Sequence, residues 1–98
     1  MTIHQEKNGN ALLIALEGRL DTMTAPNLEE TLKEALEGVT ELTFDFEKLD
    51  YLSSAGLRVL LAAQKTMNRQ GAMKVKNVNE IIQEIFEVTG FSDILTIE

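Results

Sequence analysis

The stretch of sequence that decides the fold is Leu42-Thr43-Phe44-Asp45-Phe46. Its apolar side chains recur at every second residue, which is the period of a β-strand with one buried face. A loop is predicted over residues 47–52, and a long helical pattern then begins at Ser53 and ends at Gly71. The sequence therefore predicts a central strand followed closely by a long helix that packs on the sheet.

A second strand is predicted after that helix. Met73, Val75 and Val78 are apolar and are interleaved with Lys74 and Lys76. A strand, a helix and a further strand in this order imply a right-handed crossover between parallel strands. The sheet is thus expected to be at least partly parallel.

The first forty residues predict a hairpin and a helix. The hairpin joins residues 2–6 to the apolar run 11–16 through Asn8-Gly9-Asn10, and Glu17-Gly18 is expected to close the second strand. Thr24 is the predicted N-cap of a helix with Pro26 in its first turn, which ends before Gly38. The predicted core face of this helix consists of Leu28, Leu32, Ala35 and Leu36.

A third helix is predicted near the C-terminus. Asn77 and Glu80 have the spacing of a capping box, and Gly90 is expected to end the helix. The apolar strip at residues 94–97 is either a last strand or a docked tail. Together these patterns predict a single α/β domain over residues 1–98, with a mixed sheet of four to five strands packed by three to four helices.

Composition excludes several classes of function. Sixteen acidic and nine basic side chains give a net charge of -7, which repels phosphate backbones, so no direct nucleic-acid binding is expected. The absence of cysteine removes disulfides, thiolate metal sites and cysteine nucleophiles. The longest uncharged apolar run, residues 11–16, is far shorter than the roughly 20 residues of a membrane span. The first residues lack a secretory signal, so the expected compartment is the cytoplasm.

Two serines stand at the predicted junction of central strand and long helix. The free N–H groups and the positive dipole end of a helix N-terminus would stabilise a phosphate on Ser53 or Ser54. Alternatively, one serine only caps the helix, and Gly56 only allows close packing against a neighbour. The residues by themselves favour this second, purely structural interpretation.

Other chemistries have weaker support. Asp45 and Asp50, with Asp21, are candidates for a cation site or an aspartyl-phosphate receiver, but acids in strand-end loops are more often solvated or capping. The only histidine, His4, lies beside the terminus and is poorly placed for a catalytic triad. The glycines are scattered, so no nucleotide or other cofactor is expected. Three methionines, Met23, Met67 and Met73, are predicted to fill the core; the alternative for a methionine near the Ser54 junction is a place on an adaptable docking face.

The segment from Tyr51 to Arg58 resembles the Asp-Ser-Ser/Thr-Gly-Leu signature of anti-sigma factor antagonists, which belong to the STAS family. The resemblance covers nearly the whole chain, including the predicted turn at residues 17–21. When the sequences are aligned on Gly56-Leu57, the phosphorylated serine of the family falls on Ser54. Its preceding acid is replaced by Ser53, and its following hydroxyl residue is replaced by Ala55.

This resemblance implies a regulatory protein that is not an enzyme. In the family, the unphosphorylated protein binds an anti-sigma factor that is also a serine kinase, and so frees a sigma factor. Phosphorylation, here at Ser54 or alternatively at Ser53, ends binding, and a serine phosphatase restores it. The implied partner-binding residues are Asp21, Ser53, Ser54, Ala55, Gly56, Leu57 and Arg58. The Asp21 carboxylate either orients the serine hydroxyl or contacts the partner, or else only bonds the backbone of its own turn.

Two alternatives remain beside this hypothesis. The replacements at Ser53 and Ala55 are consistent with a STAS scaffold that is not phosphorylated and serves another signalling, lipid-related or transport-related assembly. A small hydrolase or transferase with Ser54 as its nucleophile is a third possibility, but no usable base accompanies the serine.

Overall fold

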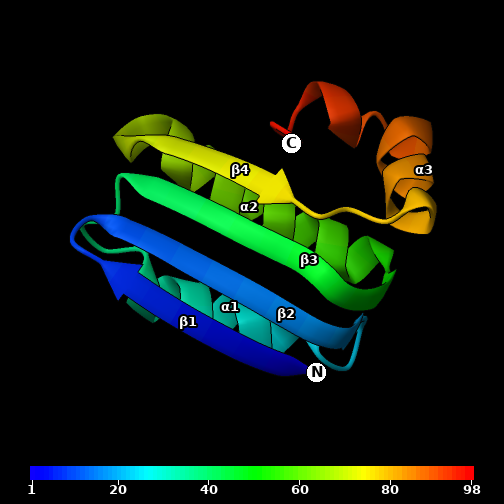
Figure 1. The fold of residues 1–98 in the computed structure, drawn as a ribbon, viewed down its shortest axis with the longest axis horizontal. Coiled ribbons are helices and arrows are strands. Elements are labelled where there is room, and N and C mark those ends of the chain that lie inside the picture. The colour runs from blue at the N-terminus through cyan, green and yellow to red at the C-terminus, as the bar shows by residue number, and fades with distance from the viewer.

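A computed structural model describes residues 1–98 as a four-stranded mixed sheet with helices on one of its faces (Figure 1). The strands lie in the order β1-β2-β3-β4, in which β1 is antiparallel to β2 and the other two pairings are parallel. The elements are β1 (Thr2–Asn8), β2 (Ala11–Leu20), α1 (Ala25–Ala35), β3 (Glu41–Leu52), α2 (Ser54–Gln70), β4 (Ala72–Lys76), α3 (Glu80–Thr89) and the 3-10 turn η1 (Phe91–Asp93). The predicted α/β architecture is confirmed.

The helices are unevenly distributed around the sheet. Helices α1 and α2 lie behind the strands in Figure 1, whereas α3 stands beyond β4, near the end of the sheet where α2 begins. The core lies between the sheet and α1 and α2, and alternate residues of β2 and β3 enter it as the two-residue period predicts. The largest buried side chains there include Ile14, Leu16, Leu42, Phe44 and Phe46.

Both central strands are longer than the sequence pattern predicts. Strand β2 continues past Glu17-Gly18 to Leu20, and β3 runs to Leu52, so the predicted loop at residues 47–52 is wrong. The parallel pairing of β2 with β3 continues to the pair Leu20 and Leu52, but its register shifts twice on the way. Each bulge breaks the alternation of apolar residues. Because this alternation is interrupted at residues 47–52, the sequence there looks like that of a loop although the residues form a strand.

One predicted helix cap is confirmed in position, and another is wrong. Thr24 is the N-cap residue of α1, but its side chain makes no cap bond; its hydroxyl accepts from the N–H of Asp21 at 2.9 Å and donates to the carbonyl of Arg19 at 2.8 Å. The cap of α3 is Asn79, whose side-chain oxygen accepts from the N–H of Ile82 at 2.9 Å. Asn77 instead adopts a positive φ of 59°, a conformation that asparagine tolerates.

The C-terminal strip is a docked tail with one strand-like bridge. Leu95 is buried, and Ile97 forms a parallel bridge with Val75 of β4. The N–H of Val75 donates to the carbonyl of Thr96, and the N–H of Glu98 donates to the carbonyl of Val75, both at 2.9 Å. The tail therefore occupies the outer edge of β4 at Val75.

Candidate docking site

The two serines at the start of α2 have different surroundings. Ser53 is the N-cap, and its hydroxyl oxygen accepts from the N–H of Gly56 at 3.4 Å. The N–H of Ser53 also donates to the carbonyl of Leu20 at 2.9 Å, which ties the helix start to the end of β2. Ser54 is the first residue of α2 and is exposed. Ser53 therefore has the structural role that the sequence allowed, and Ser54 is the more accessible hydroxyl.

Gly56 brings the first turn of α2 against the sheet. A Cβ at this position would lie 2.7 Å from Cγ of Leu20 and 2.7 Å from Cδ1 of Leu52, closer than real Cβ atoms approach other atoms. The close packing expected at Gly56 is therefore present. Its neighbour Leu57 is buried in the same core. These two signature residues position Ser54 and are not themselves available to a partner.

Asp21 binds the backbone of its own turn. Its Oδ1 accepts from the N–H of Met23 at 3.0 Å and from the N–H of Thr24 at 3.1 Å, so the turn-forming alternative describes its contacts. Desolvation raises the pKa of the Asp21 carboxyl, but these hydrogen bonds, the Thr24 hydroxyl and the charge of Arg19 outweigh it. The pKa consequently lies below its ordinary value. The carboxylate is a fixed negative charge beside the start of α2.

Arg19 and Tyr51 lie beside Asp21, although the sequence prediction did not include them among the partner-binding residues. The guanidinium of Arg19 lies 4.2 Å from the centre of the Tyr51 ring, and its Nε lies 3.6 Å from Oδ2 of Asp21. The two residues are paired across the parallel strands β2 and β3. No local sequence pattern marks these two residues as neighbours, because only the strand register brings them together.

Met23 extends the same surface outward. Its side chain is 83% exposed, so the prediction that it fills the core is wrong, whereas Met67 and Met73 are buried as predicted. Flexible, polarisable methionine side chains are common on adaptable binding surfaces. Of the remaining predicted contact residues, Arg58 is exposed and Ala55 is half-buried. We use the name docking face for Arg19, Asp21, Met23, Tyr51, Ser53, Ser54, Ala55 and Arg58.

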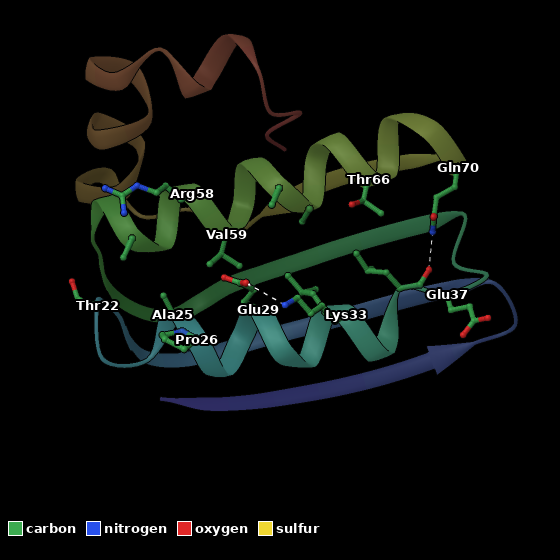
Figure 2. A pocket seen from close by; sticks show the side chains of 15 residues that line it. Thr22, Ala25, Pro26, Glu29, Lys33, Glu37, Arg58, Val59, Thr66 and Gln70 are labelled. Atoms are coloured by element: carbon green, nitrogen blue, oxygen red, sulfur yellow. Dashed lines mark hydrogen bonds and ion pairs between the residues drawn. The ribbon is translucent and has the colours of Figure 1, made fainter.

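A groove of about 740 Å³ runs between α1 and α2 beside the docking face (Figure 2). Ala55 and Arg58 line one end of it. At the other end, the side-chain amide of Gln70 donates to the carbonyl oxygens of Leu36 and Val39, at 2.7 and 2.6 Å. Its lining mixes alanine, valine and leucine side chains with charged ones, among them the ion pair of Lys33 with Glu29, so the groove is only partly apolar.

The aspartates form no cation site. No three of the histidine, aspartate and glutamate side chains are grouped so that they could hold a metal ion. Oδ1 of Asp45 instead accepts from the side-chain amide of Asn77 at 2.9 Å and from the N–H of Glu47 at 3.0 Å. Desolvation raises the pKa of Asp45, but these bonds and the charge of Lys76 lower it by more. The pKa therefore lies below its ordinary value.

Two further expectations concern His4 and membranes. His4 lies on β1, and its Nε2 is 3.4 Å from Oε2 of Glu17, which places it in a pair with an acid of the neighbouring strand. The only histidine is therefore not placed to activate a serine at the start of α2.

Each helix of the chain is too short or too polar to cross a bilayer.

The comparisons with known proteins identify the family of the chain. Residues 3–96 match the family model described as "Mlab, STAS domain", and the chain therefore belongs to the STAS domain family. It is 29% identical over 98 residues to the anti-sigma-B factor antagonist of Bacillus subtilis (strain 168), covering 99% of this chain and 90% of that protein. It is 31% identical over 97 residues to the anti-sigma-B factor antagonist of Listeria monocytogenes serovar 1/2a, with coverages of 96% and 84%.

Solved structures show the same fold. The anti-sigma factor antagonist SpoIIAA in its unphosphorylated form has a TM-score of 0.79 at 19% identity, covering 99% of this chain and 87% of that one. The Bacillus cell fate determinant SpoIIAA in its phosphorylated form has a TM-score of 0.78 at 19% identity, with coverages of 99% and 91%. The predicted family and fold are thus confirmed.

Proposed function

We propose that this protein is an anti-sigma factor antagonist whose docking face is switched by phosphorylation of Ser54. In its unphosphorylated form it binds an anti-sigma factor that is also a serine kinase, and thereby releases a sigma factor. A serine phosphatase reverses the modification. The exchange takes place in the cytoplasm, where sigma factors act. The two relatives whose names are anti-sigma-B factor antagonist support this role.

The observation that carries the proposal is the difference between the two serines. The Ser53 hydroxyl is engaged as a cap and the residue is half-buried, so a kinase reaches it less readily than Ser54. Ser54 is exposed one residue later, among the free N–H groups of the helix start. The first turn of α2 contains no acidic side chain to oppose a phosphate. A kinase can therefore modify Ser54 without unfolding the helix.

The electrostatics of the docking face support a switch by charge. A phosphate adds about 1.5 to 2 negative charges near the fixed carboxylate of Asp21. A partner surface that fits the unmodified face must then bury like charges and desolvate the phosphate. Both terms oppose binding, so the complex dissociates while the fold persists.

The experiment compares phosphorylation and binding in the same variants. Purified protein is incubated with its cognate anti-sigma kinase and ATP, and its intact mass is measured. We expect one phosphate on the wild type and on Ser53→Ala, and none on Ser54→Ala. Calorimetry should show that Ser54→Asp loses the partner and that Ser54→Ala retains it. Thr40→Asp is the matched control, because Thr40 is exposed and lies at the opposite end of α2.

A second candidate function is a STAS scaffold that is never phosphorylated. It is favoured by Ser53 at the position of the signature acid and by Ala55 at the position of the second hydroxyl residue. Phosphosite mapping on protein isolated from growing and stressed cells separates the two functions. Phosphate on Ser54 that changes with condition supports the switch, and its persistent absence supports the scaffold.

A further inference from the structure

Helix α3 carries an apolar stripe that the core does not use. Its core-facing residues are Ile82 and Phe86, which are fully buried. Ile81 and Val88 are 62% and 80% exposed, and the half-buried Ile85 lies between them in sequence. The spacing of four and three residues places these three side chains in one row along the helix. We call this row the α3 stripe.

Single exposed apolar residues are ordinary on protein surfaces, but a row of them on one helix is typical of a contact surface. The other large exposed apolar residues are Met23 and Tyr51 on the docking face and Ile94 just after η1. The exposed apolar surface therefore gathers in two places, the docking face and the C-terminal segment that contains α3.

The charge around the α3 stripe restricts what can cover it. Helix α3 carries three acidic side chains, Glu80, Glu84 and Glu87, and no lysine or arginine. Residues 77–98 hold five acidic side chains in all, of which Glu98 is paired with Lys74 of β4 at 3.6 Å. Glu84 is on the same helix face as the stripe, three residues after Ile81 and four before Val88. A second copy of the stripe and an anionic lipid surface are both repelled by these charges. The complementary occupant is a basic protein segment.

We propose that the α3 stripe is a second contact for the protein partner, and that it takes a segment whose apolar side chains are flanked by lysine or arginine. The proposal rests on the proposed function, because the partner is the anti-sigma factor. The side-chain amide of Asn79, the cap of α3, donates to the carbonyl of Leu49 at 3.1 Å, close to the end of β3. Figure 1 accordingly shows α3 at the end of the sheet where α2 begins. One partner can therefore reach both surfaces.

The test uses the same anti-sigma factor and calorimetric assay. Ile81→Ser combined with Val88→Ser removes the exposed apolar groups without touching the core, and its thermal denaturation should match the wild type. We expect its Kd to rise about tenfold or more, as for residues at the centre of an interface. Phosphorylation of Ser54 in this variant should proceed to completion at a saturating kinase concentration. An unchanged Kd overturns the proposal.

A pair of charge reversals tests the basic character of the partner segment. Glu84→Lys on α3 and Glu30→Lys on α1 change the net charge equally, and both residues are exposed. Glu84→Lys should weaken binding clearly more than Glu30→Lys. Equal effects contradict a local basic contact.

The remaining outcomes separate the two proposals. If the wild type binds and Ser54→Asp does not, while both α3 variants bind normally, only the α3 contact is wrong. If the wild type fails to bind the anti-sigma factor, both proposals are wrong. Two other results would also overturn the proposed occupant. One is a wild-type dimer in sedimentation that the combined Ile81→Ser and Val88→Ser changes dissociate. The other is binding of the wild type to vesicles of anionic phospholipid.

Discussion

The two ends of α2 both approach the sheet at a glycine, but they are held in different ways. At the C-terminal end, a Cβ on Gly71 would overlap the carbonyl oxygen of Thr40, and that same carbonyl accepts from the N–H of Ala72 at 2.9 Å. At the N-terminal end, a Cβ on Gly56 would meet only the side chains of Leu20 and Leu52. Each end has one backbone hydrogen bond of 2.9 Å to a neighbouring segment, but the glycine itself lies against backbone at one end and against leucine side chains at the other.

The residues that anchor α2 most rigidly are therefore at the opposite end of the helix from the docking face. The end of α2 that is fixed by backbone contacts carries no residue of the docking face. The end that carries Ser54 rests on leucine side chains, and its closest backbone link is the bond between Ser53 and Leu20. Small rearrangements on binding or phosphorylation are therefore cheaper at the docking end.

The largest effect is expected for Gly71→Ala. The added methyl group must displace backbone, so unfolding in urea should show a loss of about 3 kcal/mol or more. Gly38→Ala is the control, because a Cβ there meets open space and only the positive φ of 77° opposes it. That change should cost about 1 to 2 kcal/mol. Equal losses of stability in the two variants would contradict the interpretation that backbone contacts at Gly71 hold the C-terminal end of α2 rigidly.

A smaller effect is expected for Gly56→Ala, about 1 to 3 kcal/mol, because the leucine side chains can move. Combining it with Leu20→Ala removes the atoms nearest to the new methyl group. The double variant should therefore lose less stability than the sum of the two single changes. Thr40→Ala should give no such relief to Gly71→Ala, since the overlap there is with backbone. Strict additivity at Gly56 would show that the two ends are equally rigid.

At the docking end itself, Ser53→Ala should cost about 0.5 to 1 kcal/mol, because it removes a long cap bond. Ser54→Ala should change stability by less than about 0.5 kcal/mol, since the residue is exposed. Thermal denaturation of both variants measures the difference. The reverse order would identify Ser54 as the structural serine and remove the basis for its role as the switch.

The smallest expected effect is on the loss of stability at low pH. Asp21 at the docking end and Asp45 on β3 both have a pKa lowered by folding, so each stabilises the protein above the unfolded value near 3.9. This stability is lost as the pH falls through the lower folded pKa. Asp21→Asn and Asp45→Asn should each flatten the fall in stability between about pH 5 and pH 3. Urea midpoints measured across that range provide the check, and an unchanged slope would contradict the shift.

Sequence patterns predicted the elements whose signals are local. The alternation at residues 42–46, the glycine at each end of α2 and the turn at Asn8-Gly9-Asn10 all depend on neighbouring residues. The signature segment likewise located the start of α2 and its exposed serine. These features required no knowledge of distant contacts.

The features that sequence reasoning missed depend on contacts between distant residues. The bulged continuation of β3 is stabilised by pairing with β2, about thirty residues earlier, and its apolar period is broken. The cap of α3 falls on Asn79, whereas the side chain of Asn77, just after β4, is bound by Asp45 of β3. Arg19 and Tyr51 meet only through the strand register. Local patterns contain none of this information.

The two outer edges of the sheet are unequal. Residues 96–98 occupy the hydrogen-bonding groups of Val75 on the β4 edge, whereas β1 has a neighbour only on its inner side. Growth of a fibre by strand addition requires two open edges on each molecule, one to receive and one to extend. The tail blocks the β4 edge at Val75, so a strand from a second copy must displace it before it can pair there, whereas β1 can receive a strand directly. The short tail thus hinders continuous strand pairing between copies at one of the two edges.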